Sequence, residues 1–438
     1  MTTSKKGPAS ADRRPALRTA WERIKTHPLA HLGPGLITGV ADDDPSGIAT
    51  YSQAGAQFGL NMLWTMPLTF PLMAAVQSMC ARLGRVTGKG LAANIKAALP
   101  PWVLPILVVL LLVANILNIG ADVAAMGEAA ELVLHVDRHL MTILFVVTSL
   151  LLQVFVPYHR YVGILKWLTL SLVTYAAVLF VVRVPWAEVG LRTVMPHFKS
   201  NSEAATMIVG IFGTTISPYL FFWQASEEVE DMQGGHPDLP LKTNPKAAKP
   251  ELRRIRWDTL IGMFFSNGTA FLIMLATATT LNVAGVTNID TAAQAASALK
   301  PVAGPLASTL FALGILGTGL IAVPVLAGSG AYAMAEAMNW KWGLERRSTD
   351  ARGFYGVIAV SILAGIVIQY SPIDPIKALF WSAVINGVVA VPLIVVIVML
   401  VSRKSVMGRF TVGKGVAALG WITAVVMALA ALRMIIPG

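Results

Sequence analysis

The sequence has few charged residues. Asp, Glu, Lys and Arg make up 13% of its 438 residues, hydrophobic residues make up 55%, and the mean hydropathy is +0.66. Because soluble domains contain about a quarter charged residues, this composition excludes a soluble globular protein. It predicts an integral membrane protein that contacts the lipid bilayer. The net charge of +11 does not indicate a nucleic-acid partner, because the basic residues lie in loops between apolar runs.

The sequence also lacks several markers of other functions. Its single cysteine, Cys80, lies in an apolar run, which excludes a disulfide framework and a thiolate metal cluster. It has no Gly-x-x-x-x-Gly-Lys-Ser/Thr loop and no nucleophile–base constellation, so we expect neither an ATP-driven pump nor an enzyme, and no bound cofactor. The seven histidines lie in loops or at the ends of apolar runs, which argues against a histidine-based metal site.

Long apolar runs fill the rest of the chain. Since about 20 apolar residues cross a bilayer, we predict an all-α protein with eleven membrane spans, of which the first and sixth are broken. A basic cytoplasmic tail (residues 1–30) precedes the membrane-spanning region (31–438), which contains a first repeat (about 34–182), a second (about 203–401) and an extra helix (413–436). The spans run roughly over 34–58, 60–81, 102–132, 139–157, 161–182, 203–226, 257–282, 304–335, 355–370, 376–401 and 413–436.

The distribution of Lys and Arg predicts the orientation. With the N-terminus in the cytoplasm, 27 of the 34 Lys and Arg residues fall on the cytoplasmic side. We therefore expect a multi-pass protein of a bacterial-type plasma membrane, with its C-terminus outside. Nothing in the sequence requires an oligomer.

Residues 39–48 interrupt the first span with three successive carboxylates, a proline and a glycine. A carboxylate at bilayer depth is costly, and Pro45 breaks the helix, so that carbonyls are freed. Irregular backbone at that depth is tolerated where it lines a cavity. Asp44 together with freed carbonyls forms an oxygen-rich cation site. Gly47 lines this site.

The sixth span contains a matching interruption. Pro218 leaves the carbonyl of Thr214 without its helical donor, and the small residues around Ser217 let the unwound backbone face a ligand. Spans 1–5 and spans 6–10 form two halves of five spans each. Because five is an odd number, the second half begins on the opposite side of the membrane, and the two halves are inverted relative to one another. Paired interruptions in corresponding spans indicate the substrate site of an inverted-repeat transporter.

These residues resemble the NRAMP family of divalent metal transporters. The similar stretch is Gly33 to Trp64, with Asp44-Pro-Ser-Gly47 where the family has Asp-Pro-Gly-Asn. The resemblance implies a LeuT-type fold with a 5+5 inverted repeat and breaks in spans 1 and 6 at the midplane. It also implies that a divalent cation is the substrate.

Several positions differ from the family pattern. Gly47 replaces an asparagine ligand, and Ser217-Pro-Tyr219 replaces Met-Pro-His. A hydroxyl in place of a thioether favours hard ions. Gln224 replaces a second histidine, and Ala125 replaces one carboxylate of a pair that includes Asp122. These changes resemble the NRAMP-related magnesium transporters.

The sequence therefore predicts a secondary transporter that moves Mg²⁺, with Mn²⁺ as the second candidate, by alternating access without proton coupling. Two alternatives stay open: a proton-coupled Mn²⁺/Fe²⁺ importer and a LeuT-type amino-acid carrier. The predicted metal-site residues are Asp44, Gly47, Thr214 and Ser217. The candidates for an ion path are Asp42, Asp43, Tyr219, Asp122 and Asn386.

Overall fold

The computed structural model describes residues 34–156, 168–197, 201–233 and 239–436. The predicted tail at residues 1–30 and the first part of the fifth predicted span lie outside the described residues. Within the described residues the chain is helical and forms no strand. This agrees with the all-α prediction.

The long helices follow the predicted spans closely. In chain order they are α2 (Pro34–Asp42) with α3 (Pro45–Phe58), α4 (Thr65–Thr87), α6 (Val103–Leu134), α7 (Arg138–Phe155), α9 (Val173–Val181), α11 (Ser202–Thr215) with α12 (Pro218–Gln233), α13 (Ala248–Thr277), α16 (Ala307–Met338), α17 (Arg352–Gly365), α18 (Pro375–Ser402) and α20 (Lys414–Ile435). Short helices in the connections include α5 (Leu91–Ala98), α10 (Trp186–Val194), α14 (Ala292–Ala296), α15 (Lys300–Ala303) and α19 (Lys404–Met407).

Eight helical segments of the described residues are long and apolar enough to cross a membrane, or nine if one bent pair is counted as a span. That pair is Pro45–Met62 and Thr65–Thr87, which meet at 113°. The pair corresponds to the first two predicted spans. The fifth predicted span corresponds to the shorter apolar helix Leu170–Val181. The eleven predicted spans therefore all have a helical counterpart, although three of them are short or bent.

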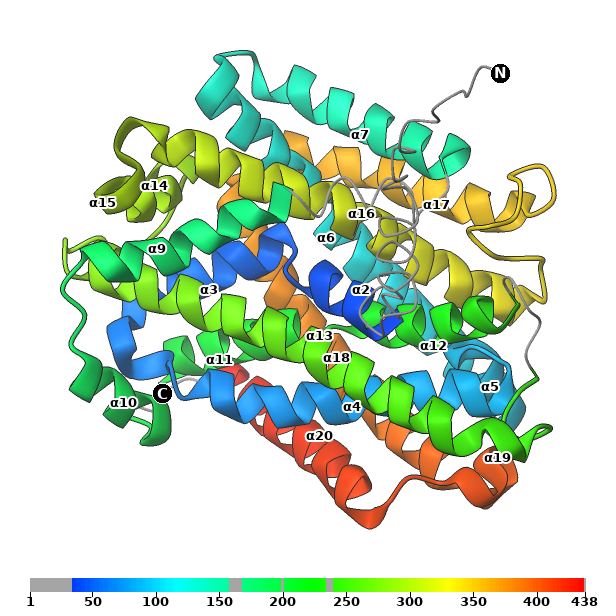
Figure 1. Ribbon diagram of the computed structural model, residues 1–438. Coiled ribbons are helices and arrows are strands. Elements are labelled where there is room, and N and C mark those ends of the chain that lie inside the picture. Colours follow the sequence, from blue (N-terminus) through cyan, green and yellow to red (C-terminus); the bar gives the residue numbers. More distant parts are fainter. Residues whose placement is uncertain (1–33, 157–167, 198–200, 234–238, 437–438) are drawn as a thin grey trace, which may run out of the picture. The chain divides into compact units, whose positions relative to one another are not determined.

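The two broken helix pairs lie inside the helical bundle. The pair α2–α3 contacts α11 and α12, and α13 packs along α2, α3 and α4. On another side α18 contacts α3, α6 and α11, while α6 also packs against α16 (Figure 1). The junctions of both pairs are thus enclosed by long helices.

Close backbone contact fixes α11 against α18. A side chain on Gly213 would clash with the Ala383 carbonyl oxygen and the Gly387 backbone, so only glycine allows this approach. Gly387 in turn lies against the Val209 carbonyl. Small residues are a common means of bringing membrane helices together, and here they hold the second break against α18.

Large apolar side chains are exposed on the outer helices. Phe180 on α9 is 90% exposed, and Leu151 on α7 and Leu429 on α20 are more than half exposed. Surfaces of this kind on helices of span length are those that lipid covers. The chain is a multi-pass integral membrane protein.

Candidate functional site

The first break places Asp44 at the start of α3. Asp44 has an extended backbone conformation (φ −68°, ψ 168°) and caps the helix, whose first residue is Pro45. Its Oδ1 atom accepts hydrogen bonds from the Gly47 backbone N–H at 2.8 Å and from the Ser46 hydroxyl at 2.7 Å. Asp44 is 1% exposed. The N-cap preference of aspartate and the fixed φ of proline explain why the helix restarts here.

The second break separates α11 from α12 at Ile216 and Ser217. Pro218 has no N–H to give to the carbonyl four residues earlier, that of Thr214. The Ser217 hydroxyl lies 2.7 Å from this carbonyl oxygen and 2.8 Å from that of Gly213, and it donates to them in place of the missing N–H. Sequence analysis predicted the freed carbonyl but not that Ser217 would bond to it.

The two breaks meet at Gly47. A Cβ atom on Gly47 would lie 3.1 Å from Thr214 Oγ1 and 3.5 Å from Asp44 Oδ1. Thr214 is 1% exposed, and its Oγ1 interacts with the Asp44 carboxyl group at longer range than a standard hydrogen bond. The structure brings Asp44, Gly47 and Thr214 together, and Ser217 joins them through the Thr214 carbonyl. Thr214 presents a hydroxyl to this site in addition to its carbonyl.

Tyrosines connect the broken ends across the same junction. The Tyr219 hydroxyl donates to the Ala41 carbonyl oxygen at 3.1 Å, which gives a partner to a carbonyl near the end of α2. The hydroxyls of Tyr51 and Thr215 lie 3.0 Å apart. The predicted path residue Tyr219 thus contacts the end of α2, next to the aspartates.

Two residues that sequence analysis missed complete the surroundings of Asp44. Asn118 on α6 donates from Nδ2 to Asp44 Oδ2 at 2.9 Å. Ser382 on α18 lies 2.6 Å from Asn118 Oδ1 and donates to it. Asn118 precedes Asp122 by four residues and so lies on the same face of α6. That spacing was the available signal in the sequence.

The remaining path candidates differ in their surroundings. Asp122 and Asn386 are fully buried, and neither side chain has a hydrogen-bond partner within the described part of the chain. Asp42 and Asp43 both accept from the Ser266 hydroxyl on α13, the latter at 3.1 Å. The three successive aspartates therefore diverge, since Asp42 and Asp43 bond to α13 and Asp44 bonds to α3 and α6.

A second acidic cluster lies at the end of α12 and is held by other partners. Glu228 pairs with Arg254 on α13 at 2.7 Å. Glu230 accepts from the Tyr332 hydroxyl and from the Leu344 N–H, both at 2.8 Å. In the described residues no group of three or more His, Cys, Asp or Glu could hold a metal ion. The site at Asp44 is instead one carboxylate among hydroxyl, amide and carbonyl groups.

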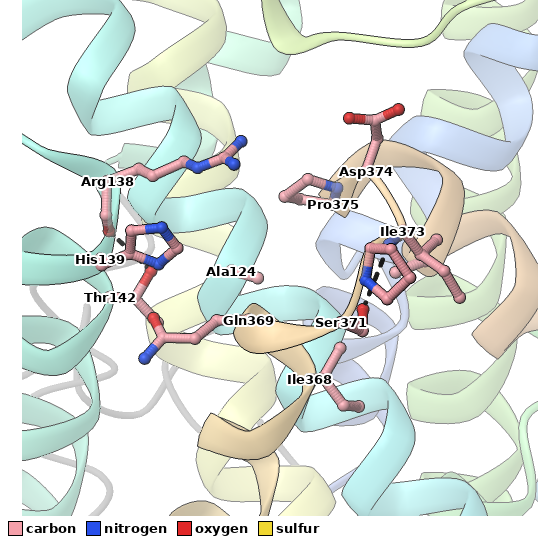
Figure 2. Close-up of a pocket in the computed structure, with 12 residues that line it drawn as sticks. Ala124, Arg138, His139, Thr142, Ile368, Gln369, Ser371, Ile373, Asp374 and Pro375 are labelled. Carbon is pink, nitrogen blue, oxygen red and sulfur yellow. Dashed lines mark hydrogen bonds between the residues drawn. The ribbon is translucent and has the colours of Figure 1, made fainter.

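A pocket of about 110 Å³ lies at the connections α6–α7 and α17–α18. Figure 2 shows Arg138 and His139 on one side of it and Asp374 and Pro375 on the other. None of the predicted site residues lines it. The candidate site at Asp44 lies instead at a junction of helix ends.

Comparison with known proteins gives consistent matches along the chain. Residues 35–437 match the family described as "Natural resistance-associated macrophage protein-like", Nramp. The "Divalent metal cation transporter MntH" of Mycobacterium tuberculosis is 27% identical over 443 residues, which are 97% of this chain and 94% of that protein.

Solved structures show the same fold. The manganese transporter of Eremococcus coleocola is 19% identical, with a TM-score of 0.73 over 98% of this chain and 88% of that one. MhsT, solved in complex with L-phenylalanine, is 11% identical, with a TM-score of 0.63 over 91% of this chain and 98% of that one. The predicted LeuT-type fold is confirmed.

The contact between Gly47 and Thr214 gives a prediction for stability. Gly47→Ala adds a methyl group 3.1 Å from Thr214 Oγ1, and crowding of this kind costs about 1–3 kcal/mol. We expect a lower unfolding temperature for Gly47→Ala in detergent, and recovery of most of the loss in Gly47→Ala/Thr214→Ala. Gly268→Ala on α13, where nothing lies within 4 Å, is the control. Additive losses in the double variant would show that the two residues do not touch.

Proposed function

The chain belongs to the Nramp family, as its match over residues 35–437 shows, and we propose that it moves divalent metal cations across a membrane through the site at Asp44. The resemblance seen in the sequence is thus confirmed, and the chain is a transporter, not an enzyme. The observation that carries the proposal is the buried Asp44 carboxylate at the meeting point of two broken helices. The hydroxyl of Thr214 lies beside it.

Helix ends and side chains would share the work of holding the ion. Asp44 supplies the negative charge, and Thr214 supplies a hydroxyl and a carbonyl oxygen. The C-terminal ends of α2 and α11 bring the negative ends of two helix dipoles to the same junction. Gly47 has no side chain and leaves room for retained water. Ser217 keeps the last carbonyls of α11 directed at the break.

The chemistry of these groups supports hard cations. The side chains that hydrogen-bond to Asp44 offer oxygen and amide groups, which suit Mg²⁺ and Mn²⁺ better than soft metals. The named relatives support a divalent metal as cargo, since one is called a divalent metal cation transporter and another a manganese transporter. Among hard ions we propose Mg²⁺ first and Mn²⁺ second, because Ser217 stands where the family has a thioether.

We propose the arrangement in the membrane from the loop charges. The side that carries 27 of the 34 Lys and Arg residues is cytoplasmic, which places the N-terminus inside and the C-terminus outside. The two halves, 34–182 and 203–401, alternate access by moving the helices around the fixed junction at Asp44. The helix 413–436 lies outside this repeat.

The path of the ion is proposed to pass buried polar groups on either side of the junction. Asp42 and Asp43 lie toward α13, while Asp122 and Asn386 lie on α6 and α18. Tyr219 contacts the end of α2 between them. Unpartnered polar groups that are fully buried, such as Asp122, are costly unless they serve a function.

The assignment of Asp44 is tested by Asp44→Ala. Asp44→Ala removes the anionic ligand of the proposed site, and loss of a buried charge partner costs about 3–5 kcal/mol, roughly 100-fold or more in affinity. We expect calorimetry with Mg²⁺ and Mn²⁺ to show almost no binding. Asp350→Ala, at an exposed loop position, is the control and should bind as the unchanged protein does. Unchanged affinity in Asp44→Ala would place the ion elsewhere.

Ion preference is tested at Ser217. Ser217→Met introduces a soft sulfur beside the Thr214 carbonyl, so the affinity for Cd²⁺ should rise relative to that for Mg²⁺. Ser217→Ala is the matched control, because it removes the same hydroxyl without adding sulfur. Competition of Cd²⁺ and of Mg²⁺ against Mn²⁺ gives the ratio of the Cd²⁺ affinity to the Mg²⁺ affinity. A ratio that is the same in Ser217→Met and Ser217→Ala would mean that position 217 does not face the ion.

Coupling of metal transport to proton movement is tested in proteoliposomes. Among the described histidines, His135 lies at the end of α6 and His139 lies in the first turn of α7. Tyr219 and Gln224 replace the histidines of the family. We propose uncoupled transport, for which an inside-negative 100 mV adds about 4.6 kcal/mol of drive to a doubly charged ion. An internal pH dye should show no metal-dependent acidification at zero potential. Acidification that is lost in Asp122→Asn would instead establish proton coupling through Asp122.

A further inference from the structure

Three hydrogen-bond donors contact the carboxylate of Asp44. Oδ1 accepts from Ser46 and from the Gly47 N–H, and Oδ2 accepts from the amide of Asn118. A carboxylate oxygen has two lone pairs, so Oδ2 is the atom with room for a cation. A cation at Oδ2 would then face the positive NH₂ group of Asn118, which is unfavourable at short range.

The other end of the Asn118 side chain has a partner that can reverse its role. The Ser382 hydroxyl donates to Asn118 Oδ1 at 2.6 Å, but it also lies 2.7 Å from the Leu379 carbonyl oxygen. A hydroxyl has one proton and can both donate and accept. If Ser382 gives its proton to Leu379, its oxygen is free to accept a hydrogen bond from Asn118 Nδ2. Both orientations of the Asn118 amide therefore keep every group near Ser382 paired.

We propose that Asn118 is a ligand of the transported cation, through a half-turn of its side-chain amide. In one orientation of the amide, Nδ2 donates to Asp44. With the ion bound, Oδ1 faces the ion beside Asp44 Oδ2, and Nδ2 donates to Ser382. This inference rests on the proposed function, and it adds α6 to the helices that hold the ion.

Packing around Asn118 suits this reversal. Asn118 and Ser382 are 0% and 3% exposed, on helices that pack against one another. The two ends of an asparagine amide have nearly the same shape, so the half-turn requires no extra volume in a dense interior. The change also links ion binding to α18, because the bound state requires Ser382 to donate to its own helix and no longer to α6.

Two variants of Asn118 separate a ligand from a residue that only positions Asp44. Asn118→Ala removes both functions, and we expect Mg²⁺ and Mn²⁺ to bind roughly 10- to 100-fold more weakly in calorimetry. Asn118→Asp offers an anionic oxygen to a cation but, when ionised, has no proton to give to Asp44. A ligand role therefore predicts that Asn118→Asp restores affinity to at least that of the unchanged protein. A purely positioning role predicts affinity as weak as that of Asn118→Ala.

The chain provides a matched control on the same helix. Asn115 is 1% exposed, and its amide donates to the Leu326 carbonyl and the Ser329 hydroxyl, both at 2.8 Å on α16. Asn115→Ala removes a similar buried amide without touching Asp44, so ion affinity should stay within about twofold of the unchanged value. Thermal unfolding without metal, measured for every variant, reports folding separately from binding.

Ser382→Ala provides an independent readout. It leaves the Asn118–Asp44 hydrogen bond in place but removes the acceptor that Nδ2 needs in the bound state. We expect weaker ion binding without the loss of thermal stability that a disrupted Asp44 would cause. This variant also tests the proposal if Asn118→Ala does not fold.

The outcomes distinguish this inference from the function on which it rests. Binding by the unchanged protein that is lost in Asn118→Ala and restored in Asn118→Asp supports the ligand role. If Asn118→Ala binds the ion as tightly as Asn115→Ala does, the ligand role is wrong and the Asp44 site is unaffected. If Asn118→Ala and Asn118→Asp bind equally weakly, the ligand role is also wrong and the Asp44 site is again unaffected. If the unchanged protein binds no divalent metal, the proposed function fails, and the role of Asn118 fails with it.

Discussion

The burial of the Asp44 carboxylate is the constraint on which the rest of the site depends. A carboxyl group at 1% exposure among apolar helices needs hydrogen-bond partners, nearby dipoles or a counter-ion. The chain supplies it by ending α2 early and restarting as α3, so that Asp44 caps a helix N-terminus. The broken helix and the buried charge therefore explain one another, and Asn118 completes the compensation from α6.

The second break contributes acceptor groups to the same junction, whereas the first break supplies hydrogen-bond donors to Asp44. Pro218 removes a donor from the end of α11, and Ser217 replaces it only in part, since one hydroxyl proton is shared between two carbonyls. Gly213 and Gly387 allow α18 to approach this weakened end closely. Oxygen groups from several helices are thus concentrated at one point while their backbones stay packed. This concentration of oxygen groups is the basis of the cation site proposed above.

The breaks were predictable from the sequence because proline and clustered aspartates act locally. Residues 44–47 and 214–218 are recognisable because they interrupt apolar runs with proline and polar residues. The span boundaries follow from hydropathy. Asn118 and Ser382 could not be predicted in the same way, because a single polar residue in an apolar helix does not reveal which helix it faces. Asn118 is 74 positions from Asp44, and Ser382 is 264 positions from Asn118, so only tertiary packing creates this link. The divergence of Asp42 and Asp43 toward Ser266 on α13 was likewise not predictable from sequence.

Location of the ion itself tests this account most directly. Crystals of the protein soaked with Mn²⁺ and measured near the manganese absorption edge would give one anomalous peak for each bound ion. The account predicts a peak at the junction of α3 and α11, in direct or one-water contact with Asp44 Oδ2 and Thr214. A peak found only at Glu228 and Glu230 at the end of α12, with none at Asp44, would contradict it.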